Sequence, residues 1–324
     1  MLVRKFLRIS AVAGLSLSLL SSNLAAYAAD LVTPSPTPSI SPTDLPLYNQ
    51  PKTVDRLVPK KLNPALVNAK RDRPKPYLDR CHTQQNLTVS TASCLYGDAT
   101  SKTTVVLFGD SHALSWFPAI EKLAIAKKWR LYSLTMSSCW PAAVPAWNSK
   151  TMKVMKNCSI WRASTLGRIA KLHPSLLFVA GTRGFATVDG NGTVLTGDAR
   201  TNAWLVGMKD TLDKLKVASQ RVVLISDTPV SAFDPPICLL AHPTSVLNCS
   251  TSIAKAISLT WLAEEREVAS EENVFWVDPT LWVCPTDPCS PISGNTLIYA
   301  DAGHLTASFA VKLEKPLWKE VSAA

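Results

Sequence analysis

The chain has 324 residues, of which 47% are hydrophobic and 18% are charged. This length fits one large domain, or one domain with a tail. Its 34 Lys and Arg residues exceed its 24 Asp and Glu residues, which gives a formal net charge of +10 at pH 7. Because no nucleic-acid-binding motif accompanies this charge, we expect no nucleic-acid partner.

The first residues have the features of a secretory signal peptide. Three basic residues precede an apolar stretch at residues 9–20, and small residues follow, with Ala26-Tyr27-Ala28 as an A-x-A cleavage site. The apolar run is short and rich in serine, which favours cleavage over a retained membrane anchor. No later stretch is long and apolar enough to span a bilayer. The sequence therefore predicts a cleaved signal peptide at residues 1–28 and an extracytoplasmic protein, secreted or associated with the cell envelope.

Two segments of unusual composition separate this signal from the folded body. Residues 29–46 form a Pro/Ser/Thr-rich linker that favours extended, polyproline-like states. Residues 47–80 are a basic, proline-rich arm, which we expect to be irregular and to pack in part against the domain. The arm indicates either weak attraction to an anionic envelope polymer or a solvated basic tail. The domain itself is predicted to span residues 81–324.

The domain has the pattern of an α/β fold. Five short apolar runs are predicted as strands, at residues 104–108, 131–134, 176–180, 222–226 and 274–277. Segments of helical periodicity lie at residues 113–128, 159–172, 199–218 and 253–270, and a last helix is expected after His304. Strands buried on both faces that alternate with helices indicate a central, mostly parallel five-stranded sheet with helices on both faces. The Asp-Gly-Asn-Gly sequence at residues 189–192 predicts a small hairpin.

Eight cysteines in an exported chain imply disulfide bonds. Their clustering along the sequence favours bonds between consecutive cysteines. The predicted pairs are Cys81 with Cys94, Cys139 with Cys158, Cys238 with Cys249, and Cys284 with Cys289. Because no CxxC pair occurs, we expect no zinc site.

The residues that carry chemistry lie in two short segments. Gly109-Asp110-Ser111-His112 follows the first predicted strand directly, and Asp301-Ala302-Gly303-His304 lies near the end of the chain. A serine hydroxyl becomes nucleophilic when a histidine removes its proton and a carboxylate orients that histidine. Sites in open parallel sheets form beyond the carboxyl ends of the strands, so both segments are expected at the same edge. We therefore predict Ser111, Asp301 and His304 as catalytic residues.

The neighbours of Ser111 have expected roles of their own. Ser111 begins a helix, so its backbone N–H can point at a developing oxyanion. Asp110 is interpreted as shaping the turn. His112 is interpreted as a helix-start residue with a structural hydrogen bond, with contact to substrate as the alternative. The G-x-S-x-G pattern is absent here, which argues against an α/β-hydrolase.

These segments resemble a known family. Leu107-Phe108-Gly109-Asp110-Ser111-His112 resembles the first block of the SGNH hydrolases, the GDSL-type esterases, and Asp301 to Thr306 resembles their last block. The similarity is closest to the SGNH domain found C-terminal to the membrane acyltransferase family 3 module. It extends over roughly residues 77–320 and includes Ser138-Cys139 and Asp227-Thr228-Pro229.

The resemblance implies a fold, an activity and a site. The fold is a three-layer, flavodoxin-like SGNH fold. The activity is transfer of O-acyl groups, usually acetyl, on envelope polysaccharides, with Ser111, Asp301 and His304 as the triad and with no cofactor. The membrane module is missing from this sequence, so the acyl donor is expected to be a separate membrane acyltransferase or a pre-formed ester.

Two blocks of the family depart from its pattern. Ser138 stands where the family has a glycine, and its backbone N–H can still donate to an oxyanion. The asparagine block has no asparagine, and Thr182 or Arg183 is the candidate for the second oxyanion donor. The alternative for Arg183 is a bond to a neighbouring carboxylate. Losing one donor costs roughly a hundred- to a thousandfold in rate.

Three tryptophans are expected near Ser111, namely Trp116, Trp140 and Trp147. Flat aromatic faces stack on sugar rings, which suits a glycan substrate; the alternative is that these side chains belong to the core.

The sequence thus predicts an exported serine acyl-transfer enzyme, an O-acetyltransferase or an O-acetylesterase, that acts on an acylated envelope polysaccharide. Both reactions share an acyl-enzyme on Ser111 and differ in whether the pocket excludes water and positions a sugar. The alternative is a non-catalytic, glycan-binding module of the envelope, motivated by the altered oxyanion blocks and the basic arm. The intact set of Ser, Asp and His argues against that alternative.

Overall fold

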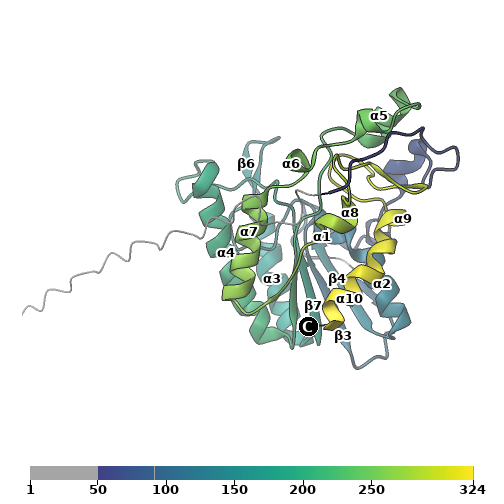
Figure 1. Ribbon diagram of the computed structural model, residues 1–324. Coiled ribbons are helices and arrows are strands. Elements are labelled where there is room, and N and C mark those ends of the chain that lie inside the picture. The colour runs from purple at the N-terminus through teal and green to yellow at the C-terminus, as the bar shows by residue number, and fades with distance from the viewer. Residues whose placement is uncertain (1–49, 91, 324) are drawn as a thin grey trace, which may run out of the picture. The chain divides into compact units, whose positions relative to one another are not determined.

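The computed structural model describes residues 50–90 and 92–323 (Figure 1). The predicted signal peptide and linker lie outside these residues, as do the first residues of the predicted arm. Within the described ranges, no helix has the length and apolar character needed to cross a membrane.

The centre of the domain is a seven-stranded sheet, in which five strands run parallel in the order β4-β3-β7-β8-β9. Their bounds are Thr104–Gly109 for β3, Arg130–Met136 for β4, Leu176–Ala180 for β7, Val222–Ile225 for β8 and Phe275–Val277 for β9. Counted along the chain, this order is the doubly wound, flavodoxin-like one. The predicted fold class and all five predicted strands are therefore confirmed.

The sheet is buried on both faces because β3 presents apolar side chains to each. Val105 and Leu107 lie in one core cluster, and Val106 and Phe108 lie in the other. Helices α2 and α10 cover the first face, and helices α3, α4 and α7 cover the second (Figure 1). Their bounds are Phe117–Ala126 for α2, Lys156–Leu172 for α3, Gly197–Ala218 for α4, Leu259–Glu271 for α7 and Glu314–Ala323 for α10.

Two predicted helices are each split in the structure. The segment 113–128 forms α1 (Ser111–Ser115) and α2, because Pro118 favours a new helix start after Trp116. The segment 253–270 forms α6 (Ile253–Ala256) and α7, and the Ser258 side chain caps α7 by accepting the Trp261 N–H.

Several short elements lie outside the predicted pattern. Strands β1 (His82–Thr83) and β2 (Leu95–Gly97) both pair with β4, the first in parallel and the second antiparallel, and they bring the sheet from the predicted five strands to seven. The remaining ones are β5 (Trp147–Asn148), β6 (Lys153–Val154), α5 (Pro235–Ala241), α8 (Thr280–Val283), β10 (Ile292–Ser293), β11 (Thr296–Leu297) and α9 (Ala307–Ala310). The hairpin expected at residues 189–192 is present as an antiparallel bridge between Val188 and Val194.

The described part of the arm packs against the domain. Its two 3-10 helices span Leu66–Arg71 and Lys75–Tyr77. Val58, Leu62 and Leu66 lie against a small apolar cluster of the domain that contains Leu239 and Leu297. Asp72 accepts the Ala307 N–H on its carbonyl and the Ser308 N–H on its carboxylate, so the arm also caps the start of α9.

The disulfides of the structure join the eight cysteines in the four predicted pairs. The paired residues are 13, 19, 11 and 5 positions apart, so each bond closes a short loop. Disulfide bonds of this number are typical of proteins in oxidising, extracytoplasmic compartments.

The carboxyl group of Glu265 is buried between helix α7 and its neighbours in the core. Glu265 of α7 is 3% exposed and lines a cavity of about 10 Å³. Trp140 and Trp261 line the same cavity, and among the described residues neither their Nε1 atoms nor Glu265 Oε2 has a hydrogen-bond partner. Burial raises the pKa of Glu265 to about 8.

We expect Gly109→Ala to destabilise the fold by about 2–4 kcal/mol. Gly109 has a φ of +146°, and an added Cβ would lie 1.9 Å from the carbonyl oxygen of Ala180 on β7. The matched control is Gly167→Ala in α3, where an added Cβ meets nothing within 4 Å. Urea denaturation of both variants measures the free energy of unfolding. Equal stabilities would contradict the close approach of β3 to β7.

We also expect the free energy of unfolding to fall between pH 4.5 and about 8 because of Glu265. The native state keeps this proton up to about pH 8, whereas the unfolded chain releases it near 4.5, so rising pH favours unfolding. Glu265→Gln removes this contribution. The free energy of unfolding of Glu265→Gln, relative to that of the wild type, should therefore rise with pH by up to roughly 1.4 kcal/mol per pH unit. Urea denaturation at several pH values tests this, with the exposed Glu267→Gln on the same helix as control. Parallel pH dependences for wild type and Glu265→Gln would refute it.

Candidate functional site

The site begins at the turn between β3 and α1. Asp110 is the N-cap of α1, and its Oδ1 accepts the N–H groups of His112 at 2.8 Å and Ala113 at 3.3 Å. This cap places Ser111 as the first residue of the helix, directly beyond the carboxyl end of β3. The predicted role of Asp110 in shaping the turn agrees with these bonds.

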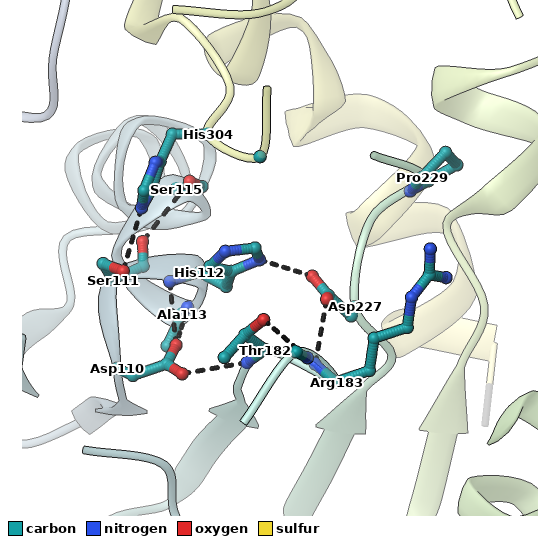
Figure 2. A network of polar contacts seen from close by, with 12 residues as sticks. Asp110, Ser111, His112, Ala113, Ser115, Thr182, Arg183, Asp227, Pro229 and His304 are labelled. Atoms are coloured by element: carbon teal, nitrogen blue, oxygen red, sulfur yellow. Dashed lines mark hydrogen bonds and ion pairs between the residues drawn. The ribbon is translucent and has the colours of Figure 1, made fainter. Parts of the chain in front are cut away.

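Asp110 also ties β3 to the neighbouring strand β7. Its Oδ2 accepts the N–H of Thr182, which lies two residues beyond the end of β7, at 2.9 Å (Figure 2). The Asp110 side chain is fully buried, and this burial raises its pKa, against the charge of His112 and the bonds from Thr182 and His112. The chain order of the sheet reverses between β3 and β7, which is where doubly wound folds form their sites.

Ser111, His304 and Asp301 form a continuous chain of hydrogen bonds. The Nε2 of His304 lies 2.9 Å from Ser111 Oγ (Figure 2). Its Nδ1 lies 2.9 and 3.0 Å from the two carboxylate oxygens of Asp301. Asp301 Oδ1 also accepts the backbone N–H groups of Gly303 and His304, which holds the turn in one conformation. The structure therefore brings together the three residues that the sequence singles out.

The charge on Asp301 is held by its neighbours. Burial alone would raise the pKa of Asp301, but the hydrogen bonds and charge of His304, with the Gly303 N–H, lower it below its usual range. Arg73 of the arm also contacts this carboxylate, with its Nη2 3.5 Å from Asp301 Oδ2. An ionised Asp301 fixes the His304 ring with Nδ1–H facing it and leaves Nε2 to accept a proton from Ser111.

A second histidine–carboxylate pair lies beside the first. The Nδ1 of His112 is 2.6 Å from Oδ1 of Asp227, which lies two residues beyond the end of β8. Burial acts to lower the pKa of His112, but the charge and hydrogen bond of Asp227 outweigh it and raise that pKa to about 9. The rings of His112 and His304 are 5.0 Å apart between centroids. Asp227 carries no role in the sequence interpretation, and its position at a strand end is the signal that points to it.

The backbone N–H groups of the four residues considered as oxyanion donors fall into two sets. Those of Thr182 and Arg183 are engaged, with Asp110 Oδ2 at 2.9 Å and Asp227 Oδ2 at 3.0 Å. Those of Ser111 and Ser138 have no acceptor among residues 50–90 and 92–323. Ser138 has a φ of +54°, the left-handed conformation that favours glycine, so a glycine in that block of the family fits this backbone.

The structure therefore corrects one expectation for the oxyanion donors. Thr182 and Arg183 do not offer free N–H groups, because buried carboxylates accept both. The Arg183 guanidinium points elsewhere and donates to the carbonyl of Ala256. The alternative expected for Arg183, a bond to a neighbouring carboxylate, is made by its backbone N–H.

Two of the three tryptophans belong to the core, as the alternative interpretation has it, and are not glycan contacts. Trp116 is 1% exposed and Trp140 is 3% exposed, and each lies within a core cluster. Neither ring therefore presents a face on which a sugar could stack, because apolar packing covers both. Trp147 on β5 is half-buried and keeps part of its surface accessible.

The described part of the chain has no group of three His, Cys, Asp or Glu side chains arranged to hold a metal ion.

Comparison of folds finds related solved structures at low sequence identity. The periplasmic domain of lipopolysaccharide acetyltransferase from Salmonella ser. Paratyphi A is similar with a TM-score of 0.53 and 15% identity, over 68% of this chain and 84% of that one. An aryl esterase from M. smegmatis has a TM-score of 0.40 and 14% identity, over 68% and 99% of the two chains. An acetylxylan esterase from Geobacillus stearothermophilus has a TM-score of 0.40 and 10% identity, over 68% and 94%.

Comparison of the sequence with curated proteins gives no match. Comparison with protein families matches residues 80–319 to the SGNH domain of the kind fused to AT3 domains. This match covers β3, the Ser111 turn and the Asp301–His304 turn together with the whole parallel sheet. The chain therefore belongs to the family of SGNH domains of the type fused to AT3 domains.

Proposed function

We propose that this protein is an extracytoplasmic serine acyl-transfer enzyme, an O-acetyltransferase or O-acetylesterase, that acts on acyl esters of a cell-envelope polysaccharide. The observation that carries the proposal is the unbroken hydrogen-bond chain from Ser111 Oγ through His304 to Asp301. The family supports it, and the lipopolysaccharide acetyltransferase domain with the same fold supports the substrate class. The disulfides support an oxidising compartment, and a cleaved signal peptide at residues 1–28 belongs to the same proposal.

The first half of the reaction forms an ester on Ser111. His304 Nε2 accepts the hydroxyl proton while Ser111 Oγ bonds to the acyl carbonyl carbon, and the carbonyl oxygen becomes an oxyanion. The unpaired N–H groups of Ser111 and Ser138 are the backbone donors available to that oxyanion. When the oxyanion collapses, the bond from carbon to the leaving oxygen breaks, and His304 gives its proton to that oxygen.

The second half releases the acyl group. A glycan hydroxyl or a water molecule gives its proton to His304 and bonds to the acyl carbon, and Ser111 leaves with the proton from His304. A glycan acceptor gives a new ester on the polysaccharide, and water gives a free acid. The acyl donor is a separate membrane acyltransferase or an ester already present on the polymer.

We expect Ser111→Ala to lower the hydrolysis of p-nitrophenyl acetate by at least roughly a thousandfold, because the nucleophile is lost. The free energy of unfolding should change by no more than about 0.5 kcal/mol. The exposed Ser149→Ala is the matched control and should keep the wild-type rate. Equal rates for the wild type and Ser111→Ala would leave a glycan-binding module as the function.

Mass spectrometry separates transfer from hydrolysis. The wild-type protein is incubated with p-nitrophenyl acetate and deacetylated fragments of the envelope polysaccharide. Acetylated fragments that form with the wild type and not with Ser111→Ala identify a transferase. Release of acetate alone, at a rate that the fragments leave unchanged, identifies an esterase.

A further inference from the structure

We propose that His112 is a further catalytic residue of this site, whose Nε2–H donates a hydrogen bond to an oxygen of the bound acyl ester, and that Asp227 is its positioning residue. The proposal rests on the function proposed above, because it assumes that the ester binds at Ser111 and His304.

The orientation of the His112 ring carries the first step. Its Nδ1 faces Asp227 at 2.6 Å, so its Nε2 faces away from that carboxylate. Figure 2 shows the ring between Asp227 and the Ser111–His304 pair. Across the described residues, no protein atom forms a hydrogen bond with Nε2, and the side chain is 13% exposed. The second ring nitrogen is therefore available to a ligand at the site.

Gly303 lies beside that nitrogen. A Cβ added to Gly303 would lie 3.5 Å from His112 Nε2 and 3.4 Å from Cε1. Gly303 directly precedes His304, whose ring lies 5.0 Å from that of His112 between centroids and contacts Ser111 Oγ at 2.9 Å. The Nε2 of His112 therefore adjoins the same turn that places His304 beside the serine.

The charge of the pair decides whether Nε2 donates or accepts. With Nδ1–H directed at Asp227, Nε2 carries a proton only when the imidazole is cationic. The titratable and charged groups around His112 and Asp227 are Asp110, Asp301, His304, Arg183, Glu265 and Tyr299. The carboxylates raise the pKa of His112 to about 9 against its burial, so the ring is a cation and a donor at neutral pH.

The site has a use for the His112 Nε2–H as a donor, because two nearby backbone N–H groups are already hydrogen-bonded. Thr182 and Arg183 direct their N–H groups to Asp110 and Asp227, so they cannot stabilise charge on the substrate. A cationic histidine in a partly buried site stabilises developing negative charge on an ester oxygen more strongly than a neutral donor does. Asp227 accepts the Arg183 N–H, so that group is lost as a donor to the oxyanion. The same carboxylate holds the His112 cation, whose Nε2–H is the donor that replaces it.

Kinetics of His112 and Asp227 variants test the proposal. We expect His112→Phe to lower kcat/KM for p-nitrophenyl acetate by roughly a hundred- to a thousandfold. In the wild type, kcat/KM should fall as pH rises through about 9, where His112 loses its Nε2 proton, and this limb should be absent in His112→Phe. His112→Gln keeps a neutral donor, so it should retain part of the rate without the alkaline limb. Asp227→Asn should show the alkaline limb at a lower pH than the wild type, because the charge that raises the pKa of His112 is removed.

The controls separate this inference from the proposed function. Ser111→Ala gives the background at each pH, and the exposed His242→Gln should keep the wild-type rate and profile. Wild-type kcat/KM and an unchanged alkaline limb in His112→Phe and His112→Gln, with Ser111→Ala inactive, overturn the role of His112 and leave the proposed function standing. A fully active Ser111→Ala overturns both. Urea denaturation of each variant shows that it is folded, and the pH limb in Asp227→Asn is a readout that a purely structural role would not move.

Discussion

The site depends on one buried carboxylate. Asp110 accepts three backbone N–H groups, two from the start of α1 and one from Thr182 beyond β7. A carboxylate without solvent is costly unless such donors surround it, so this interaction holds two strand ends at a fixed separation. Gly109 permits it, because only a residue without Cβ lets β3 approach the carbonyl of Ala180 this closely. Ser111 is therefore placed by the sheet edge itself and not by a flexible loop.

Three carboxylates lie around Ser111, and each accepts hydrogen bonds from backbone N–H groups. Asp110 and Asp227 engage the N–H groups that follow β7, and Asp301 engages those of its own turn. Asp227 and Asp301 each also contact the Nδ1 of a histidine, His112 and His304 respectively. The two imidazole rings lie side by side. In the proposed reaction, His304 presents a ring nitrogen that accepts a proton, and His112 presents one that donates. The arrangement offers proton removal and charge stabilisation from neighbouring rings.

Sequence patterns predict those features of this chain that depend on short-range order. Each strand of the parallel sheet is an apolar run, and Ser111, Asp301 and His304 lie in segments next to the elements that position them. The pair of His112 and Asp227 is not predictable in this way, because 115 residues separate its members and no spacing rule links them. The burial of Trp116 and Trp140, and the contact of Arg73 with Asp301, are decided by packing between distant segments. Strands β1 and β2 are too short to show any periodicity, whereas β9, also of three residues, lies within a predicted apolar run at residues 274–277.

The disulfide pattern has a consequence for how the chain matures. Every bond joins one cysteine to the next cysteine in the sequence. In a chain that crosses a membrane from its N-terminus, each thiol therefore meets its native partner before any later thiol has emerged. An oxidase that joins thiols in order of their appearance produces the native set directly, and no reshuffling by an isomerase is needed.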